Sequence, residues 1–397
     1  MPDLLKISLI LLLILFLLRK KLPIGAVMLI ASAGLAALYA MPLSSLVAAA
    51  RRAVGSDVSI KLLLALSLIR IFELILREKE VLAAMMAAVK GSFRNRKVVI
   101  ISMPLLIGML PSLGGAYFSA PMVKEATTGL KMPPEEKAFI NYWYRHPWEY
   151  ILPLYPGILL AAAVSGVPLY HLITANIAYA LVLLATGFLY SMRGVANRPQ
   201  HAEAPQARWR DGVNFLPVLA ILVSVGLLHI ELHYALLVII AVLLAAFRYS
   251  PKAIPRLLRY GFTLEVITLI AGIMFFKEIM ETSGAVRNLT AYFVSHGIPV
   301  IPIVCLLPFL AGLLTGHTVG FVGSTFPLIM NVAGNGLPVI SLAFAAGFIG
   351  VLISPVHLCL VLTREYFKAD MTGVYQRIVP ASAIIFAVAV AEYLVMR

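Results

Sequence analysis

The chain has 397 residues, of which 61% are hydrophobic and only 13% are charged, with a mean hydropathy of +0.95. Soluble domains carry about 25% charged residues, so this composition excludes a soluble globular fold as well as a disordered chain. The net charge of +14 comes from short basic blocks between apolar runs, which is typical of cytoplasmic loops and not of nucleic-acid binding. We therefore expect an all-α polytopic membrane protein.

The first apolar run, Leu9 to Leu18, is followed by Arg19, Lys20 and Lys21, where a signal peptide would have its cleavage site. We therefore expect this run to be a retained helix. Apolar stretches of about 20 residues, the length that crosses a bilayer, predict ten spanning helices. These lie at roughly 4–18, 22–41, 60–77, 138–163, 168–192, 213–229, 232–248, 263–281, 339–363 and 375–396.

Two further apolar stretches, about 98–130 and about 299–332, are each interrupted near the middle by Gly, Pro, Ser and Thr. Their arms are too short to cross the bilayer singly. Irregular backbone at membrane depth is tolerated only against protein or water. Both stretches are therefore predicted to be re-entrant hairpins.

The chain also repeats itself at an offset that drifts only from 204 to 206 residues. Pro104 and Pro308 are 204 residues apart, and Glu73 and Glu278 are 205 apart. Further pairs at these offsets are Gly108 with Gly312, Gly115 with Gly320, Ser119 with Ser324, and Pro121 with Pro327. The shared Pro, Gly and Glu positions indicate an internal duplication.

Each predicted half contains five spans and one hairpin: residues 1–192, and residues 213–397 after a linker at 193–212. An odd number of crossings makes the second half enter from the opposite side, so we expect inverted-topology repeats. The basic loop 77–97 places the linker in the cytoplasm and both termini outside. The prediction is a multi-pass protein of the cytoplasmic membrane.

The tip of the first hairpin offers small and hydroxyl residues. Glycine lets the backbone approach a ligand closely, and hydroxyl and carbonyl oxygens can replace the hydration shell of sodium. The alternative is a glycine-rich packing turn. The candidate ligands are Ser112, Gly114, Gly115 and Ser119 for substrate, with Ser112 and Gly115 also for a coupling ion.

The second tip differs because it contains a histidine, His317, which is expected at membrane depth. Ionisable groups there are costly and often functional, and histidine can carry a proton in a transport cycle. The alternative is a neutral histidine bonded to a neighbouring hydroxyl. The candidates are Thr315, His317, Thr318, Ser324 and Thr325 for substrate, and Thr315, Gly316, His317 and Thr318 for a coupling ion.

Prolines should break the helices 138–163 and 339–363, the latter at the run 353–357. Beside these breaks lie Arg145 and His146 in the first helix, and Ser354 and His357 in the second. The planar guanidinium of arginine could hold a carboxylate at two points. The alternative for Arg145 is an ion pair with Glu149 at i,i+4, or a place in an interfacial aromatic belt.

Three charged residues, Arg70, Glu73 and Arg77, share one face of the predicted helix 60–77. Buried charges need partners, and we interpret this group as a structural ion-pair set. The two cysteines, Cys305 and Cys359, lie in apolar runs and imply neither a disulfide framework nor a Cys-based metal site.

The run Asn141-Tyr-Trp-Tyr-Arg-His-Pro-Trp-Glu149, followed by Leu152-Pro-Leu-Tyr-Pro-Gly157, resembles a membrane family labelled domain of unknown function 401. Two hairpins in two inverted halves, each followed by a broken helix, are similar to the wider ion transporter superfamily. The resemblance covers essentially the whole chain. It implies an elevator-type secondary carrier that is a homodimer, and it names no substrate.

The function predicted from the sequence is a secondary active transporter driven by Na⁺ or H⁺. Arg145 and three histidines outnumber the one nearby acid, Glu149, which favours a small organic anion as substrate. No metal or organic cofactor is expected, and Na⁺ is the one candidate ion besides the proton. An ion channel and an intramembrane enzyme stay as alternatives, although no nucleotide-binding loop or nucleophile elbow is present.

Overall fold

The computed structural model describes residues 3–20, 22–81, 83–85, 88, 95–111, 115–192, 195, 209–284 and 299–396. Every regular element in these ranges is a helix, which confirms the all-helical prediction. The helices up to residue 192 are α1 (Asp3–Arg19), α2 (Ile24–Leu38), α3 (Leu43–Gly55), α4 (Asp57–Glu78), α6 (Arg96–Gly108), α7 (Gly115–Ala126), α8 (Pro134–Trp143), α9 (Trp148–Ile151), α10 (Pro156–Ser165) and α11 (Leu169–Ser191).

The second part of the chain begins with the 3₁₀-helix η1 (Trp209–Phe215), α12 (Leu216–Leu222) and the π-helix η2 (Val223–Leu227). It continues with α13 (Leu232–Ala246), η3 (Pro251–Ala253), α14 (Ile254–Gly261), α15 (Leu264–Thr282), α17 (Ile301–Thr315), α18 (Thr318–Ala333), α19 (Leu337–Leu352), α20 (Leu358–Phe367) and α21 (Met371–Met396). The predicted linker 193–212 falls almost wholly outside the described residues.

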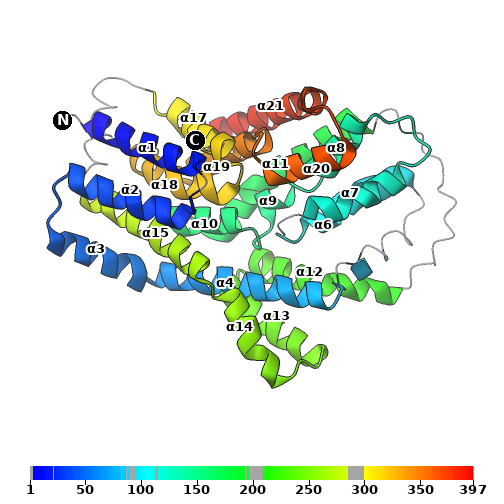
Figure 1. The fold of residues 1–397 in the computed structure, drawn as a ribbon, viewed down its shortest axis with the longest axis horizontal. Helices are drawn as coiled ribbons and strands as arrows, with labels where there is room; N and C mark the ends of the chain where they lie inside the picture. The colour runs from blue at the N-terminus through cyan, green and yellow to red at the C-terminus, as the bar shows by residue number, and fades with distance from the viewer. Residues whose placement is uncertain are drawn as a thin grey trace.

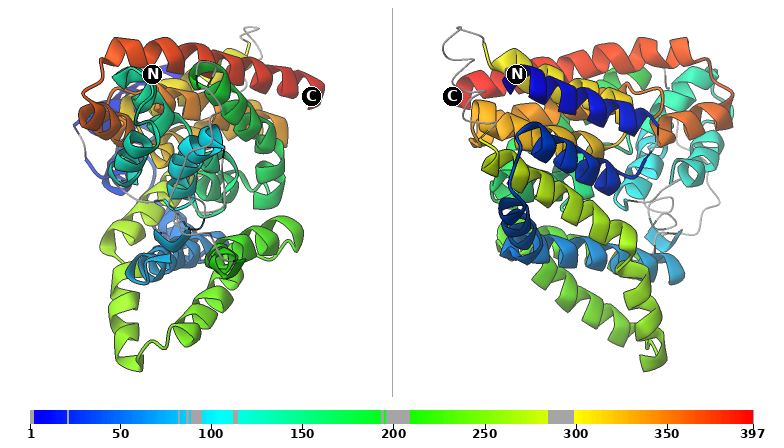
Figure 2. Two further views of the ribbon diagram at one scale, coloured as in Figure 1. Left: turned by 90° about the vertical axis from the view of Figure 1, so that its right-hand side faces the viewer. Right: turned by 60° about the vertical axis from the view of Figure 1, so that its left-hand side comes forward.

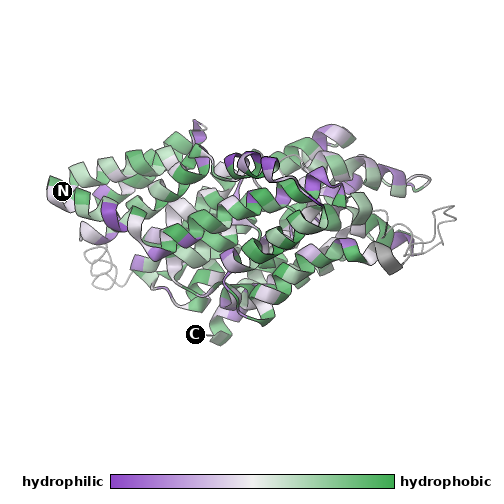
Figure 3. Cartoon of the chain, turned by 90° about the horizontal axis from the view of Figure 1, so that it is seen from below, coloured by the Kyte–Doolittle hydropathy of each residue, from purple (hydrophilic) through white to green (hydrophobic). Residues whose placement is uncertain are grey.

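The helices are arranged in two parts (Figures 1 and 2). One part contains α3, α4 and α12 to α14, which are drawn below the others in Figure 1. The helices from α6 to α11 and from α17 to α21 form the larger part, and α2 and α15 pack together between the two. Hydrophobic residues cover most of the helices (Figure 3). Several of them are exposed, such as Leu181 and Val238. Apolar outer faces of this kind are typical of proteins embedded in lipid.

Helix length agrees only partly with the ten predicted spans. Three segments of the described chain are long and apolar enough to cross a membrane: Pro134–Ser165, Leu169–Ser191 and Met371–Met396. Six more apolar helices have only 10–17 residues, among them α2, α13 and α19. At 1.5 Å per residue they are shorter than a hydrocarbon core of about 30 Å. Length and composition therefore support three of the ten predicted spans within the described residues, and the others stay predictions.

The two interrupted stretches each form a pair of short helices that pack against each other, α6 with α7 and α17 with α18. The four helices have 13, 12, 15 and 16 residues in chain order. These lengths agree with the predicted short arms. Their course in a bilayer and the side from which each pair enters stay predictions, as does the inverted relation of the two halves.

Helices α17 and α19 approach each other through glycine. A Cβ atom on Gly312 would overlap the carbonyl oxygen of Gly347, and one on Gly350 would overlap that of Phe309. Close backbone approach through small residues is the usual way in which helices associate in lipid. This glycine seam fixes the α17–α18 pair to α19.

We expect Gly312→Ala to lower the free energy of unfolding by about 1–3 kcal/mol, because the added methyl group must push two backbones apart. Gly226→Ala is the matched control, since a Cβ at Gly226 meets nothing within 4 Å. Thermal unfolding of both variants in detergent is the measurement. Equal stability of the two variants would show that the seam does not hold α17 against α19.

Two helices lie where the sequence predicted only loops. α3 follows α2 directly, and α14 occupies the basic segment after α13. Both are short, and both place charged residues among apolar ones, so a search for long apolar runs misses them. α14 is held to α4 by Tyr260, whose hydroxyl donates to Glu73 (3.3 Å) and whose ring lies beneath the guanidinium of Arg70. Together with an Arg77–Glu73 ion pair at 3.7 Å, these contacts agree with the structural role predicted for the charged triplet.

Candidate functional site

The two helix breaks lie where proline predicted them. α8 ends at Trp143, and Pro147 starts the one-turn helix α9, which ends before Pro153 and Pro156. α19 ends at Leu352, and α20 begins only after Pro355. Proline removes a backbone donor and clashes with the preceding turn, so both helices are interrupted inside the larger part of the molecule.

The two breaks contact each other, although 211 residues separate them along the chain. The Nε2 atoms of His146 and His357 lie 3.1 Å apart. The rings are packed at a centroid distance of 5.1 Å, and the Tyr142 ring lies 4.5 Å from that of His146. Only 2% of His146 and 6% of His357 is exposed. The structure thus brings together two residues that the sequence proposed separately.

Both helix pairs, α6–α7 and α17–α18, contact the meeting point of the two helix breaks at a glycine. A Cβ on Gly108, at the end of α6, would overlap the carbonyl oxygen of Arg145. Gly316 ends α17 at φ +67°, and its carbonyl accepts from Nδ1 of His357. A side chain at Gly316 would also lie 2.9 Å from the backbone nitrogen of His357. The left-handed conformation and the close approach together require glycine here.

Arg145 is 4% exposed, and its Nε and Nη1 atoms have no hydrogen-bond partner among the described residues. It forms no ion pair with Glu149 within the described chain, so the alternative of an i,i+4 pair is not supported; Glu149 instead lies 3.8 Å from Nε2 of His146. The guanidinium interacts electrostatically with the thiol of Cys359. A buried guanidinium with free donors is suited to receive an anion.

Three groups that can ligate a metal converge beside Arg145. The ligand atoms of His146, His357 and Cys359 all lie within 4.8 Å of one another. Thr318, at the start of α18, is also buried here, because it packs on Gly157 of α10, and it interacts with Glu149. The site therefore holds an arginine, two histidines, a thiol, a carboxyl and a hydroxyl.

Other candidates bond to their own backbone surroundings. The hydroxyl groups of Ser119, Ser324 and Thr325 donate to carbonyls one turn earlier in their own helices. Ser354 donates to the carbonyl of Leu313 at 2.6 Å and so links the break in α19 to α17. Gly115 is buried in the first turn of α7. Ser112 and Gly114 lie outside the described residues.

The His317 side chain is exposed, and its expected place at membrane depth stays a prediction. The backbone at His317 is extended (φ −153°), and Gly316 before it lies against His357. Nδ1 of His317 lies 2.7 Å from the carbonyl of Thr315. Both residues line a cleft of about 380 Å³ shared with the first turns of α2 and α15. The second tip thus divides its candidates between this cleft and the buried site.

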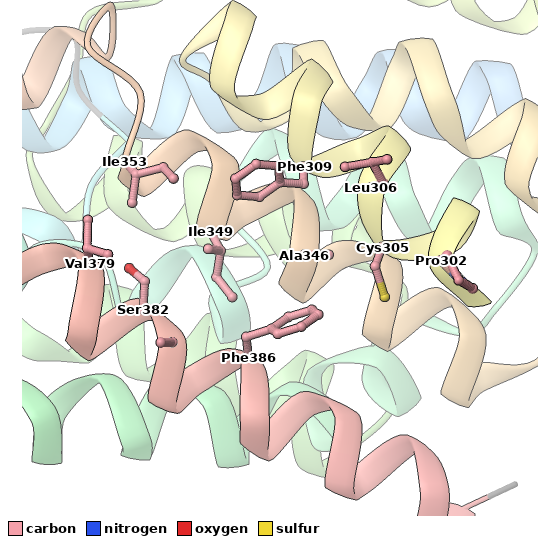
Figure 4. Close-up of a pocket in the computed structure, with 11 residues that line it drawn as sticks. Pro302, Cys305, Leu306, Phe309, Ala346, Ile349, Ile353, Val379, Ser382 and Phe386 are labelled. Atoms are coloured by element: carbon pink, nitrogen blue, oxygen red, sulfur yellow. The ribbon is translucent and has the colours of Figure 1, made fainter.

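A separate apolar pocket of about 390 Å³ lies between α17, α19 and α21 (Figure 4). Cys305, Phe309, Ile349 and Phe386 line it, and Ser382 is its one hydroxyl residue. None of the predicted site residues lines this pocket.

Neither Cys359 nor a ligand role for Glu149 was predicted from the sequence. Cys359 is the second residue of α20, one turn after the break. The sequence does place two possible metal ligands, His357 and Cys359, two residues apart. A cysteine within an apolar run, however, ordinarily packs as a small hydrophobic residue. Glu149 was considered only as a partner for Arg145 and in the charge balance of the site.

The fold and the site define an all-helical protein with apolar outer faces and two broken helices that meet at a buried polar centre. The chain belongs to the family described as "Protein of unknown function (DUF401)", whose model matches residues 4–396. This membership confirms the resemblance seen in the sequence. No curated protein matches the chain.

Among solved structures, the fold is similar to that of the YdaH transporter of Alcanivorax borkumensis, which has been described as having an unusual topology. The two share 14% sequence identity with a TM-score of 0.61, over 98% of this chain and 97% of that one. At this identity the likeness establishes a common fold over nearly the full length of both chains.

Proposed function

We propose that this protein is a secondary active transporter that moves a small organic anion across the cytoplasmic membrane, coupled to Na⁺ or H⁺. The observation that carries the proposal is Arg145, which is buried at the meeting point of two broken helices and has two guanidinium nitrogens without a hydrogen-bond partner among the described residues. An unpaired charge is expensive to bury. A ligand of opposite charge that enters the site would offset the cost of burying this unpaired charge.

The fold supports transport over the other two classes. The YdaH protein, which has the same fold, is a transporter. Broken helices whose ends meet inside a bundle are the usual substrate sites of secondary carriers. The alternatives from the sequence, a channel and an intramembrane enzyme, have no such support.

The proposed mechanism is of the elevator type, in a homodimer. The glycine seam and the Ser354–Leu313 hydrogen bond join the α17–α18 pair to α19, so these elements form one unit with the buried site. α3, α4 and α12 to α14 would supply the scaffold. The coupling ion is assigned to the two helix-pair tips: Ser112 and Gly115 in the first, and Thr315, Gly316, His317 and Thr318 in the second. No organic cofactor takes part in this mechanism.

Ligand-induced stabilisation tests the proposal. A ligand at 100 times its Kd raises the free energy of unfolding by about 2.7 kcal/mol. We expect one class of organic anion to raise the unfolding temperature of the purified protein, and the same anion to accumulate in proteoliposomes only under a Na⁺ or H⁺ gradient.

Organic cations of similar size are the control for charge. Uptake that proceeds without any gradient, or at the rate of a channel, would contradict secondary active transport. Stabilisation by cations instead of anions would contradict the role given to Arg145.

A further inference from the structure

The hydrogen bonds of the buried histidine pair fix its tautomers. Nδ1 of His146 lies 2.6 Å from the carbonyl oxygen of Tyr142, and Nδ1 of His357 contacts that of Gly316. A carbonyl oxygen can only accept, so both Nδ1 atoms must carry the hydrogen. Each neutral imidazole then has an unprotonated Nε2 with its lone pair exposed.

Those two Nε2 atoms face each other at 3.1 Å. Two lone pairs at this distance repel, so the arrangement needs a positive centre between them, either a shared proton or a metal ion. Two nitrogens bound tetrahedrally to one zinc ion at 2.0–2.1 Å would lie about 3.3–3.4 Å apart. The observed separation is therefore within a few tenths of an ångström of a metal-binding geometry.

A third candidate ligand distinguishes a metal ion from a shared proton. The sulfur of Cys359 lies within 4.8 Å of both imidazole nitrogens, which a shared proton would not require. We propose that His146, His357 and Cys359 bind a single zinc-like divalent transition-metal ion. Both imidazoles donate Nδ1–H to backbone carbonyls, which is the usual second-shell arrangement of metal-ligating histidine.

The surroundings complete a mixed nitrogen, sulfur and oxygen site. Glu149, with an oxygen 3.8 Å from Nε2 of His146, is the candidate fourth ligand. Arg145 interacts electrostatically with the Cys359 sulfur, and a neighbouring cation favours the thiolate that binds metal. A divalent ion would neutralise one thiolate and one carboxylate. The guanidinium charge would then be left for an anion. Imidazole and thiolate together select zinc and similar borderline ions over Mg²⁺ and Ca²⁺.

Cobalt substitution tests this site without any transport assay, so it can succeed or fail independently of the proposed function. The protein, purified without a polyhistidine tag and treated with a chelator, is titrated with Co²⁺. We expect one equivalent per chain to bind, with a thiolate-to-cobalt charge-transfer band and tetrahedral d–d bands, and Zn²⁺ to displace it.

The two cysteines of the chain provide a matched pair of variants. Cys359→Ser should remove the charge-transfer band and weaken metal binding more than about 100-fold, beyond the 10–100-fold typical of a lost second-shell partner. Cys305 lies in the apolar pocket, so Cys305→Ser should leave the charge-transfer band and the metal affinity unchanged. His357→Gln should also weaken binding while preserving a polar side chain of similar size.

Thermal unfolding of each chelator-treated variant shows whether it is folded. Folded wild-type protein that binds no Co²⁺ or Zn²⁺ would overturn the proposal and leave the shared proton as the explanation of the histidine pair. A charge-transfer band that survives Cys359→Ser but disappears with Cys305→Ser would overturn it as well.

Discussion

Arg145→Met should abolish binding of the anionic substrate and leave the protein at least as stable as before. Methionine fills a similar volume without a charge. Breaking hydrogen bonds to a charged group costs about 1.5–3 kcal/mol each, and a two-point contact would lose at least two. We therefore expect affinity to fall by more than about 100-fold. Because Nε and Nη1 have no partner among the described residues, removing the guanidinium mainly relieves a desolvation cost and loses only its interaction with Cys359.

Arg145→Lys separates charge from geometry. Lysine keeps the positive charge but loses the planar fork, so we expect an intermediate loss of affinity, about 10- to 100-fold. Calorimetric affinity and thermal unfolding are measured on the same samples. Arg77→Lys is the control, since Arg77 lies in the α4–α14 contact and should not affect the ligand. A marked loss of stability with unchanged affinity in Arg145→Met would assign Arg145 to the fold.

A second large effect concerns the orientation of the two halves. Cysteines at Lys131 and Asn335, which are 204 residues apart, should react with an impermeant thiol reagent from opposite sides of the membrane. Both positions are exposed, one between α7 and α8 and the other between α18 and α19. If each half has an odd number of crossings, these equivalent positions must lie on opposite sides.

In intact cells we expect the cysteine at 335 to be labelled and the cysteine at 131 to be labelled only after permeabilisation. The background carries Cys305→Ser and Cys359→Ser, and this doubly substituted parent measures labelling at other sites. Labelling of both positions from the same side would contradict the inverted repeat.

The structural features that were predicted correctly from the sequence are those that depend on local chemistry. Composition established the all-helical class, and prolines located the breaks after Trp143 and Leu352 to within a few residues. Proline acts through its own ring and missing N–H, so its effect can be read without knowledge of the partners. The short α6, α7, α17 and α18 were expected for the same reason, since Gly and Pro interrupt their apolar runs.

The features that could not be predicted from the sequence depend on contacts between distant segments. His146 and Cys359 are 213 residues apart, and nothing local signals that their side chains converge. Likewise, nothing in the local sequence predicts that the His317 side chain is exposed while Thr318 beside it is buried. The amphipathic α3 and α14 were missed because their helical form depends on the helices that they cover.

The glycine seam has a consequence for how the chain enters the membrane during synthesis. α17 and α18, with 15 and 16 residues, are each too short to span the bilayer as independent segments. The backbone of α17 is accommodated against the glycines of α19, which emerges from the ribosome only after both helices have been made. Stable integration of this pair must therefore wait for α19. A truncation after Ala333 should leave the pair accessible to quality-control proteases, whereas one after Phe367 should not.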